Sequence, residues 1–234
     1  MKHIIFSQAY PSAGLFSIPS INRIIALVCL IAVMGPWHSL QAQSTSLVLT
    51  LNSGQRALFR YAFDGGTVAT TIGSQVPPGS QLIAFNGATQ YQPTITRDRD
   101  GWWGPRGTTA LARGNAYWLY IPPVGGLVVS SQYTLTFSGA LATGPFTLTN
   151  AFGYNGVGYP YPVDYFWTNS QCAKSARNNS TLSLWDQPSQ SFVGSFKNSR
   201  GVWSGVAVTA VVKAVHGVVL FSTGSTVYVE TNPN

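Results

Sequence analysis

The chain has 234 residues, of which only 8% are charged, whereas 45% are hydrophobic and 13% are aromatic. These proportions exclude a disordered chain, which has few aromatic residues and much charge. They also argue against a coiled coil or a long surface helix, because the Glu, Lys and Arg that cover such helices are scarce. The formal net charge of +7 comes from scattered basic residues, so we expect no nucleic-acid partner. An anionic polysaccharide would suit the same modest positive excess.

The first element along the chain is an uncharged apolar run, Ile24–Gly35, preceded by Lys2 and Arg23. A charged start, a short apolar run and a small residue after it form the pattern of a secretory signal peptide. As a helix this run would span about 18 Å, short of the roughly 30 Å of a bilayer core. We therefore predict a signal peptide over residues 1–42, cleaved after Ala42, and a secreted protein located outside the cell, at the cell surface or in the periplasm. A buried core helix is the alternative for this run. No second long apolar run follows, so we expect no membrane span in the mature chain.

Cleavage would remove one of the two cysteines and leave only Cys172. A single cysteine cannot form a disulfide within its own chain. We therefore expect Cys172 to be either a free thiol or an intermolecular link.

Beyond residue 43 the pattern is typical of β-strands throughout. Runs rich in β-branched and aromatic residues are bounded by Gly, Pro, Asn and Ser, and no window of a dozen residues keeps a 3.6-residue period. The clearest runs are 46–51, 116–121, 132–137, 215–221 and 225–229. We predict an all-β fold of antiparallel β-sandwich or barrel-like repeats with little or no helix. A hairpin is expected to pair 82–85 with 91–95 through Asn86 and Gly87, a favoured turn sequence. The one expected helix is Ser170–Arg177, with Asn169 as its cap.

The sequence also repeats itself at an offset of about 100 residues, as solenoids and duplicated folds do. The matching stretches are Gly79–Asn86 with Asn179–Asp186, Gly101–Trp103 with Gly201–Trp203, Ala116–Tyr120 with Gly217–Phe221, and Tyr61–Asp64 with Tyr159–Pro162. The repeats therefore cover residues 57–122 and 155–222, within a first unit at 43–140 and a second at 141–234. Chance similarity between two β-rich stretches is the alternative interpretation.

The duplication makes specific structural predictions. Phe85 and Trp185, and likewise Trp103 and Trp203, are expected at matching buried sites. Gly114 is expected to make a tight turn that differs in the second copy, where Val215 tolerates a positive φ poorly. The segment Thr45–Leu51 lies outside both repeats. It would either complete its own chain's sheet or pair with a neighbouring subunit by adding to an open strand edge.

This pattern resembles a group of secreted bacterial proteins that carry paired copies of a β-repeat. The resemblance lies in residues 82–86, 100–105, 111–118 and 157–162, and it covers most of 57–222. It implies the duplicated β-fold and carries over no catalytic residues.

The residues that catalysis needs are scarce in the mature chain. His216 would be its only histidine, and the carboxylates at turns have a structural role there. Cys172 and His216 are too few for a zinc site, and the Gly-rich stretch at 153–158 lacks the Lys and helix of a phosphate loop. We predict no enzyme activity, with a hydrolase as the least favoured alternative, and no cofactor and no metal.

Aromatic side chains are therefore the remaining candidates for binding. Trp102, Tyr159, Tyr161 and Tyr120 are the predicted ligand-binding residues, because exposed rings can stack on sugars. The leading hypothesis is a secreted, non-catalytic structural or adhesive protein of the cell envelope or extracellular matrix, which assembles with itself through strand edges. The alternative is a carbohydrate-binding module that holds an extracellular polysaccharide on exposed aromatic residues.

Overall fold

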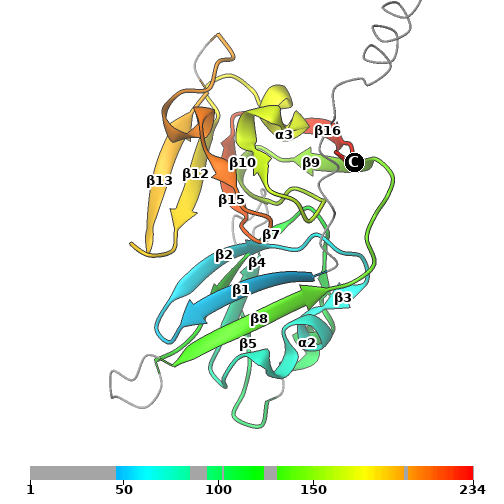
Figure 1. The fold of residues 1–234 in the computed structure, drawn as a ribbon, viewed down its shortest axis with the longest axis vertical. Helices are drawn as coiled ribbons and strands as arrows, with labels where there is room; N and C mark the ends of the chain where they lie inside the picture. The colour runs from blue at the N-terminus through cyan, green and yellow to red at the C-terminus, as the bar shows by residue number, and fades with distance from the viewer. Residues whose placement is uncertain (1–45, 85–93, 102, 124–130, 198–199, 234) are drawn as a thin grey trace, which may run out of the picture. The chain divides into compact units, whose positions relative to one another are not determined.

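The computed structural model describes residues 46–84, 94–101, 103–123, 131–197 and 200–233. These residues form antiparallel sheets in two similar halves (Figure 1). The strands of the first half are β1 (Ser46–Asn52), β2 (Arg56–Arg60), β3 (Gly66–Thr67), β4 (Gln81–Ala84), β5 (Ile95–Thr96), β6 (Ala110–Leu111), β7 (Ala116–Tyr120) and β8 (Gln132–Ser138). Those of the second half are β9 (Phe146–Asn150), β10 (Gly153–Val157), β11 (Tyr165–Phe166), β12 (Thr181–Asp186), β13 (Ser191–Phe196), β14 (Val211–Val212), β15 (Val218–Ser222) and β16 (Thr226–Glu230).

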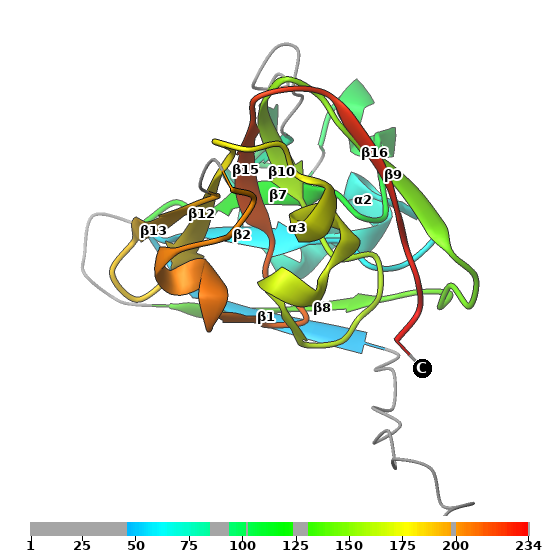
Figure 2. The same ribbon diagram turned by 90° about the horizontal axis from the view of Figure 1, so that it is seen from above.

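Helical turns in the described residues are few and short. The α-helices are α2 (Val68–Thr71) and α3 (Gln171–Ser175), and the 3₁₀ turns are η1 (Gly73–Gln75), η2 (Pro105–Thr108), η3 (Trp167–Asn169) and η4 (Gly205–Val208). Figure 2 shows α3 beside β16, with which it packs.

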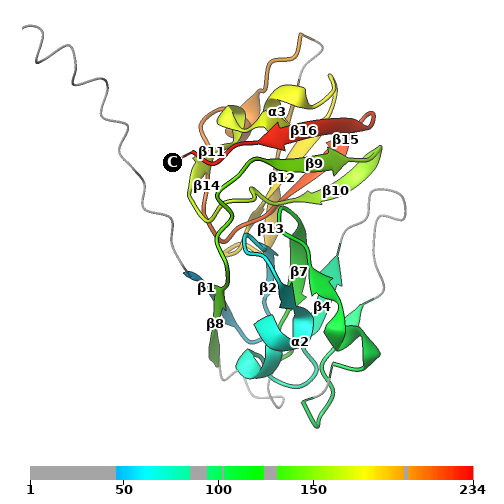
Figure 3. The ribbon, with the colours of Figure 1, turned by 90° about the vertical axis from the view of Figure 1, so that its right-hand side faces the viewer.

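The two halves have the same sheet topology. Each contains a four-stranded sheet, with order β2-β7-β4-β5 in the first half and β10-β15-β12-β13 in the second. Each also contains a pair of outer strands, β1-β8 or β9-β16, and a short pair, β3-β6 or β11-β14 (Figure 3). The predicted all-β fold and the predicted duplication are therefore both confirmed.

Strand register fixes which residues correspond. Leu82 pairs with Leu119 in the first half, as Leu182 pairs with Leu220 in the second. The offset is thus 100 residues at β4 and 101 at β7, as the sequence comparison predicted. The tryptophans also correspond in their contacts: Trp103 Nε1 donates to the Gly73 carbonyl at 3.3 Å, and Trp203 Nε1 donates to the Ala173 carbonyl at 3.0 Å.

Each half has its own hydrophobic core, built from the inward side of its strands. Trp103 and Trp203 are 4% and 7% exposed, which confirms the prediction that both are core residues. The second predicted pair of matching buried sites was Phe85 and Trp185. Phe85 lies outside the described residues, and Trp185 is only partly buried. The prediction of a buried Trp185 was wrong, because its side of β12 faces the other half rather than its own core.

The outer strands belong to the repeats, which is a correction to the sequence analysis. β1 pairs with β8 over its full length, from Ser46 opposite Ser138 to Asn52 opposite Gln132. β9 and β16 form the matching pair in the second half. The segment at 46–51 therefore completes the sheet of its own chain, because its three leucines are needed to close the first core.

Three local predictions can be compared with the structure. The helix near residue 170 is shorter than expected and is capped by Ser170 rather than Asn169, since Ser170 Oγ accepts from Ala173 N at 3.1 Å. Gly114 has a φ of +82°, whereas the equivalent Val215 has no positive φ, which confirms that the two turns differ. β4 pairs with β5, so the two predicted strands do form a pair, with Leu82 opposite Ile95; the turn predicted at 86–87 lies outside the described residues.

The two halves meet through contacts that are reciprocal. Phe59 bridges His216, and Val157 bridges Asn115. The register makes Phe59 equivalent to Val157, and Asn115 equivalent to His216, so one contact occurs twice with the halves exchanged. A contact in which each side supplies the same patch is the hallmark of a two-fold interface.

Arg60 breaks this symmetry. Arg60 N donates to the Val215 carbonyl at 2.9 Å, and the equivalent Gly158 N donates to the Gly114 carbonyl at 2.7 Å. Gly158 has no side chain, and a Cβ there would lie 2.7 Å from Arg60 Cβ. The arginine of one half therefore occupies space that the glycine of the other half leaves open.

Candidate functional site

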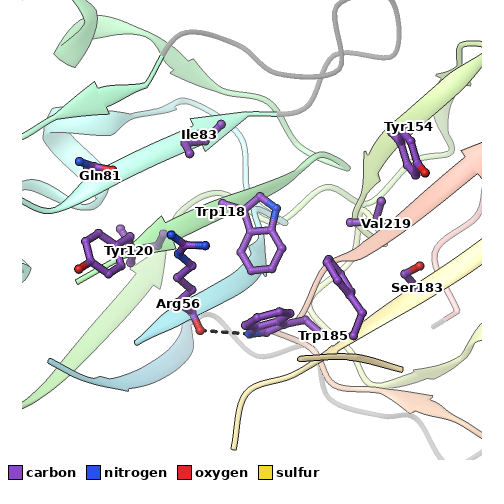
Figure 4. A pocket seen from close by; sticks show the side chains of 11 residues that line it. Arg56, Gln81, Ile83, Trp118, Tyr120, Tyr154, Ser183, Trp185 and Val219 are labelled. Carbon is purple, nitrogen blue, oxygen red and sulfur yellow. Dashed lines mark hydrogen bonds between the residues drawn. The ribbon is translucent and has the colours of Figure 1, made fainter. Parts of the chain in front are cut away.

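A hollow of about 560 Å³ lies between the two four-stranded sheets (Figure 4). We call it the groove. The first half lines it with Arg56, Gln81, Ile83, Trp118, Leu119 and Tyr120, and the second half lines it with Tyr154, Ser183, Trp185, Phe192 and Val219. The groove therefore exists only because the halves associate.

Strand alternation decides which side chains reach the groove. On β7, Tyr117 and Leu119 are buried in the core, and the intervening Trp118 and Tyr120 are partly exposed on the opposite face. Successive residues of a strand point to opposite faces, so one strand supplies both the core and the groove. On β12, Ser183 and Trp185 reach the groove by the same alternation.

Three rings form an aromatic cluster at the groove. The ring centroids of Trp118 and Trp185 are 4.7 Å apart, with an interplanar angle of 86°. Phe192 lies 5.6 Å from Trp118 and 5.1 Å from Trp185, again edge to face. Edge-to-face packing is the favoured arrangement of neighbouring rings, so the cluster is a stable apolar surface. Phe192 remains 48% exposed, which leaves this surface open to solvent.

The hairpin formed by β12 and β13 in the second half holds β2 of the first half in place. Gln190 Oε1 accepts from Arg56 N at 2.7 Å, and Gln190 Nε2 donates to the Arg56 carbonyl at 3.0 Å. Trp185 Nε1 donates to the same carbonyl at 3.1 Å, drawn as the dashed line in Figure 4. Gln187 Nε2 donates to the Thr50 carbonyl at 2.7 Å. These bonds fix the edge of the groove between the halves.

Equivalent positions in the groove carry different side chains. Ile83 faces Trp118 in the first half, where the second half has Ser183 facing Val219. Arg56 corresponds to Tyr154, because they pair with the equivalent residues of β7 and β15. The duplicated backbone therefore builds a symmetric groove, and the side chains make its two sides unlike.

The residues predicted to bind ligand fall in different places. Tyr120 lines the groove, and Tyr159 lines a separate hollow of about 400 Å³. Tyr161 is fully buried and donates to the Gly144 and Glu230 carbonyls, so its ring offers no surface to a ligand. Trp102 lies outside the described residues.

Of the groove residues, sequence reasoning named only Tyr120 as a ligand-binding candidate and missed the others, among them Arg56, Trp118 and Trp185. One signal was available for Trp118, because it shares the outward side of the strand 116–121 with Tyr120. No local sequence pattern pointed to Arg56 or to the outward position of Trp185, because both depend on the contact between the halves.

Cys172 lies in a buried polar cluster in the second half. It is 2% exposed, and its Sγ accepts from Asn150 Nδ2 at 3.3 Å. Burial raises the pKa of its thiol to about 12, so the group stays protonated near neutral pH. Glu230 Oε1 accepts from Cys172 N at 2.8 Å, and burial raises the pKa of this carboxyl above its ordinary value. The cluster supports the start of α3 and leaves the thiol out of reach of another chain.

The described residues contain no group of three or more His, Cys, Asp or Glu side chains placed to hold a metal ion. Among them there is likewise no helix with the length and hydropathy that a bilayer crossing requires.

Comparison with known proteins gives no match, whether to a family model, to a curated protein or to a solved structure.

Proposed function

We propose that this protein is a non-catalytic binding protein that holds a saccharide in the groove between its halves. The observation that carries the proposal is the cluster of Trp118, Trp185 and Phe192, open to solvent and bordered by polar groups. Sugar rings present apolar C–H faces that pack on aromatic rings, and their hydroxyls need a few hydrogen-bonding groups. A mostly apolar hollow with few polar groups is the usual form of a small-molecule site.

The polar groups of the groove suit such a ligand. Gln81 supplies both donors and an acceptor, and Ser183 on the other side supplies a hydroxyl that donates and accepts. The predicted export of the chain would bring the groove into contact with extracellular polysaccharide. The fixed position of β2 against the second-half hairpin favours a preformed site, which lowers the ordering cost of binding.

Isothermal titration calorimetry with defined oligosaccharides tests the proposal. We expect saturable binding to at least one of the tetrasaccharides of cellulose, starch or galactan, or to their uronic-acid counterparts. Trp118→Val should abolish it, and the fold should tolerate that change because Val219 occupies the equivalent position. Phe166→Ala removes an exposed ring outside the groove and serves as the control. If none of these saccharides binds, the proposal is contradicted.

Self-assembly in the cell envelope is a second candidate function, favoured by a different observation. The second half exposes apolar side chains where the first half has polar ones. Phe166 is 48% exposed and corresponds to Thr67, and Val206 is 38% exposed and corresponds to Arg106. Exposed apolar patches often mark protein–protein contacts.

Sedimentation velocity over a wide concentration range tests the second candidate. The native chain should associate, and the double variant Phe166→Thr with Val206→Arg, which restores first-half residues, should stay monomeric. Val227→Thr changes a 66% exposed valine to the residue at the equivalent position, Thr134, and provides the matched control. A native chain that is monomeric at every concentration would exclude self-assembly.

A further inference from the structure

Resting on the function proposed for the groove, we propose that its ligand is an acidic saccharide whose carboxylate pairs with Arg56. The inference comes from the charge of the groove and from the way in which this arginine is held. It names the chemical class of ligand, and it makes Arg56 the residue that selects it.

Of the described residues that line the groove, only Arg56 is charged. Its side chain lies between Tyr120 and Trp118 in Figure 4. None of the lining residues that the structure describes is a carboxylate that could neutralise it, and the salt bridges of the described residues join Arg113 to Asp64 and Lys213 to Asp164. An exposed cation in an otherwise apolar hollow favours a ligand of opposite charge.

The backbone and the side chain of Arg56 have separate partners. Its N–H and carbonyl are bound by Gln190 and Trp185, which fixes the base of the side chain. Its guanidinium carbon lies 5.5 Å from the centroid of the Tyr120 ring. Among the described residues, none accepts a hydrogen bond from this guanidinium. A guanidinium over a ring keeps its N–H donors directed outward in its own plane, where a carboxylate can accept two of them.

The asymmetry of the groove gives the ligand a direction. Arg56, Gln81 and Tyr120 gather on the side of the first half, and the equivalent side of the second half presents Tyr154 without a charge. The aromatic cluster lies between these sides. A sugar ring packed on Trp118 would therefore have its carboxylate on the Arg56 side, and the rest of the saccharide would continue toward Tyr154.

The test compares matched pairs of tetrasaccharides that differ only in the group at C6. Tetragalacturonate is titrated against α-1,4-galactotetraose, and tetraglucuronate against cellotetraose, with the full mature chain in low and in moderate salt. We expect the acidic member of at least one pair to bind more tightly, and raised salt to weaken it because ionic screening shortens the reach of the charge.

Arg56→Gln should weaken binding of the acidic tetrasaccharide by about 10- to 100-fold, the range of one charge-assisted pair. It should weaken binding of the neutral member much less. Arg99→Gln removes one exposed positive charge of the same half outside the groove and is the control for net charge. It should change neither affinity.

The two proposals fail in different ways. If acidic and neutral members bind equally through Trp118 and Arg56→Gln changes neither, the acidic ligand is refuted and the saccharide function stands. If Arg99→Gln weakens binding as much as Arg56→Gln, the selectivity comes from net charge and this inference also fails. If no tetrasaccharide binds, the function proposed for the groove itself fails.

Discussion

Replacing Arg60 by Met should destabilise the protein, because this arginine joins the two halves from a fully buried position. Its Nη1 donates to the Tyr159 carbonyl at 2.9 Å and its Nη2 to the Val163 carbonyl at 2.7 Å. Its Nε donates to the Ala214 carbonyl. All three acceptors belong to the second half. Met fills a similar volume but donates nothing, so the variant isolates the loss of the hydrogen bonds.

The magnitude follows from two opposing effects. Hydrogen bonds from a charged donor contribute about 1.5–3 kcal/mol each, so three contribute roughly 6 kcal/mol. Burial lowers the pKa of Arg60 from 12.5 to about 10. That difference is the balance between desolvation and the attraction of neighbouring groups, and it corresponds to a cost of about 3 kcal/mol for keeping the charge in this site. Met removes the benefit and the cost together, so we expect a net loss of about 3 kcal/mol.

Urea unfolding followed by tryptophan fluorescence measures this loss. Arg60→Lys should be nearly as damaging, because a single ammonium keeps the buried charge but cannot reach three carbonyls that lie in different directions. Arg99→Met, at an exposed arginine, should change the free energy of unfolding by less than about 0.5 kcal/mol. A loss below about 1 kcal/mol for Arg60→Met would refute the argument that this arginine holds the halves together.

The remaining predictions also concern stability. Gly158→Ala should cost about 1–3 kcal/mol, because its Cβ would lie 2.7 Å from the side chain of the buried arginine, whereas Gly144→Ala, with no atom within 4 Å, should cost little in the same urea titration. Trp103→Ala and Trp203→Ala should each cost about 3–5 kcal/mol by the same measurement, and a loss under about 1 kcal/mol for either would show that its ring is not a core residue. Glu230 has a raised pKa in the folded state, so its contribution to stability is fully present below the unfolded pKa and is lost as pH rises through the folded pKa. The difference in unfolding free energy between Glu230→Gln and the native chain should therefore shift in favour of the variant from pH 4 to pH 7. A difference that does not depend on pH would contradict the raised pKa of Glu230.

Much of the fold could be predicted from the sequence because the relevant signals are local. The two-residue alternation of apolar side chains identifies strands wherever one face is buried, and it placed the strands around Ala116–Ile121 and Gln132–Phe137 correctly. The repeated spacing of aromatic residues revealed the duplication, and it placed Trp103 and Trp203 at equivalent core sites. Each of these inferences needs only a residue and its neighbours along the chain.

The outer strands were harder, because their partners are distant in sequence. The segment at 46–51 was recognised as a strand, but its role in the first repeat depends on pairing with Gln132–Ser138. The matching strands of the second half have diverged, with Asn150 and Glu230 on inward sides. A comparison of residue types could not detect an equivalence that only the pairing preserves.

The sequence by itself determined which side chains could form a core and which stretches repeat, since both are written in local periodicity and composition. Only the tertiary structure decided where the groove lies, because it forms at a contact between halves that no local pattern encodes. Trp185 shows the difference. Its residue type and spacing suggested a core site, yet the face of β12 that carries it lies against the other half. Arg56 and Arg60 begin and end the same strand, and one lines an open groove while the other is fully buried. What surrounds each arginine, and therefore what each does, is set by the second half packed against it.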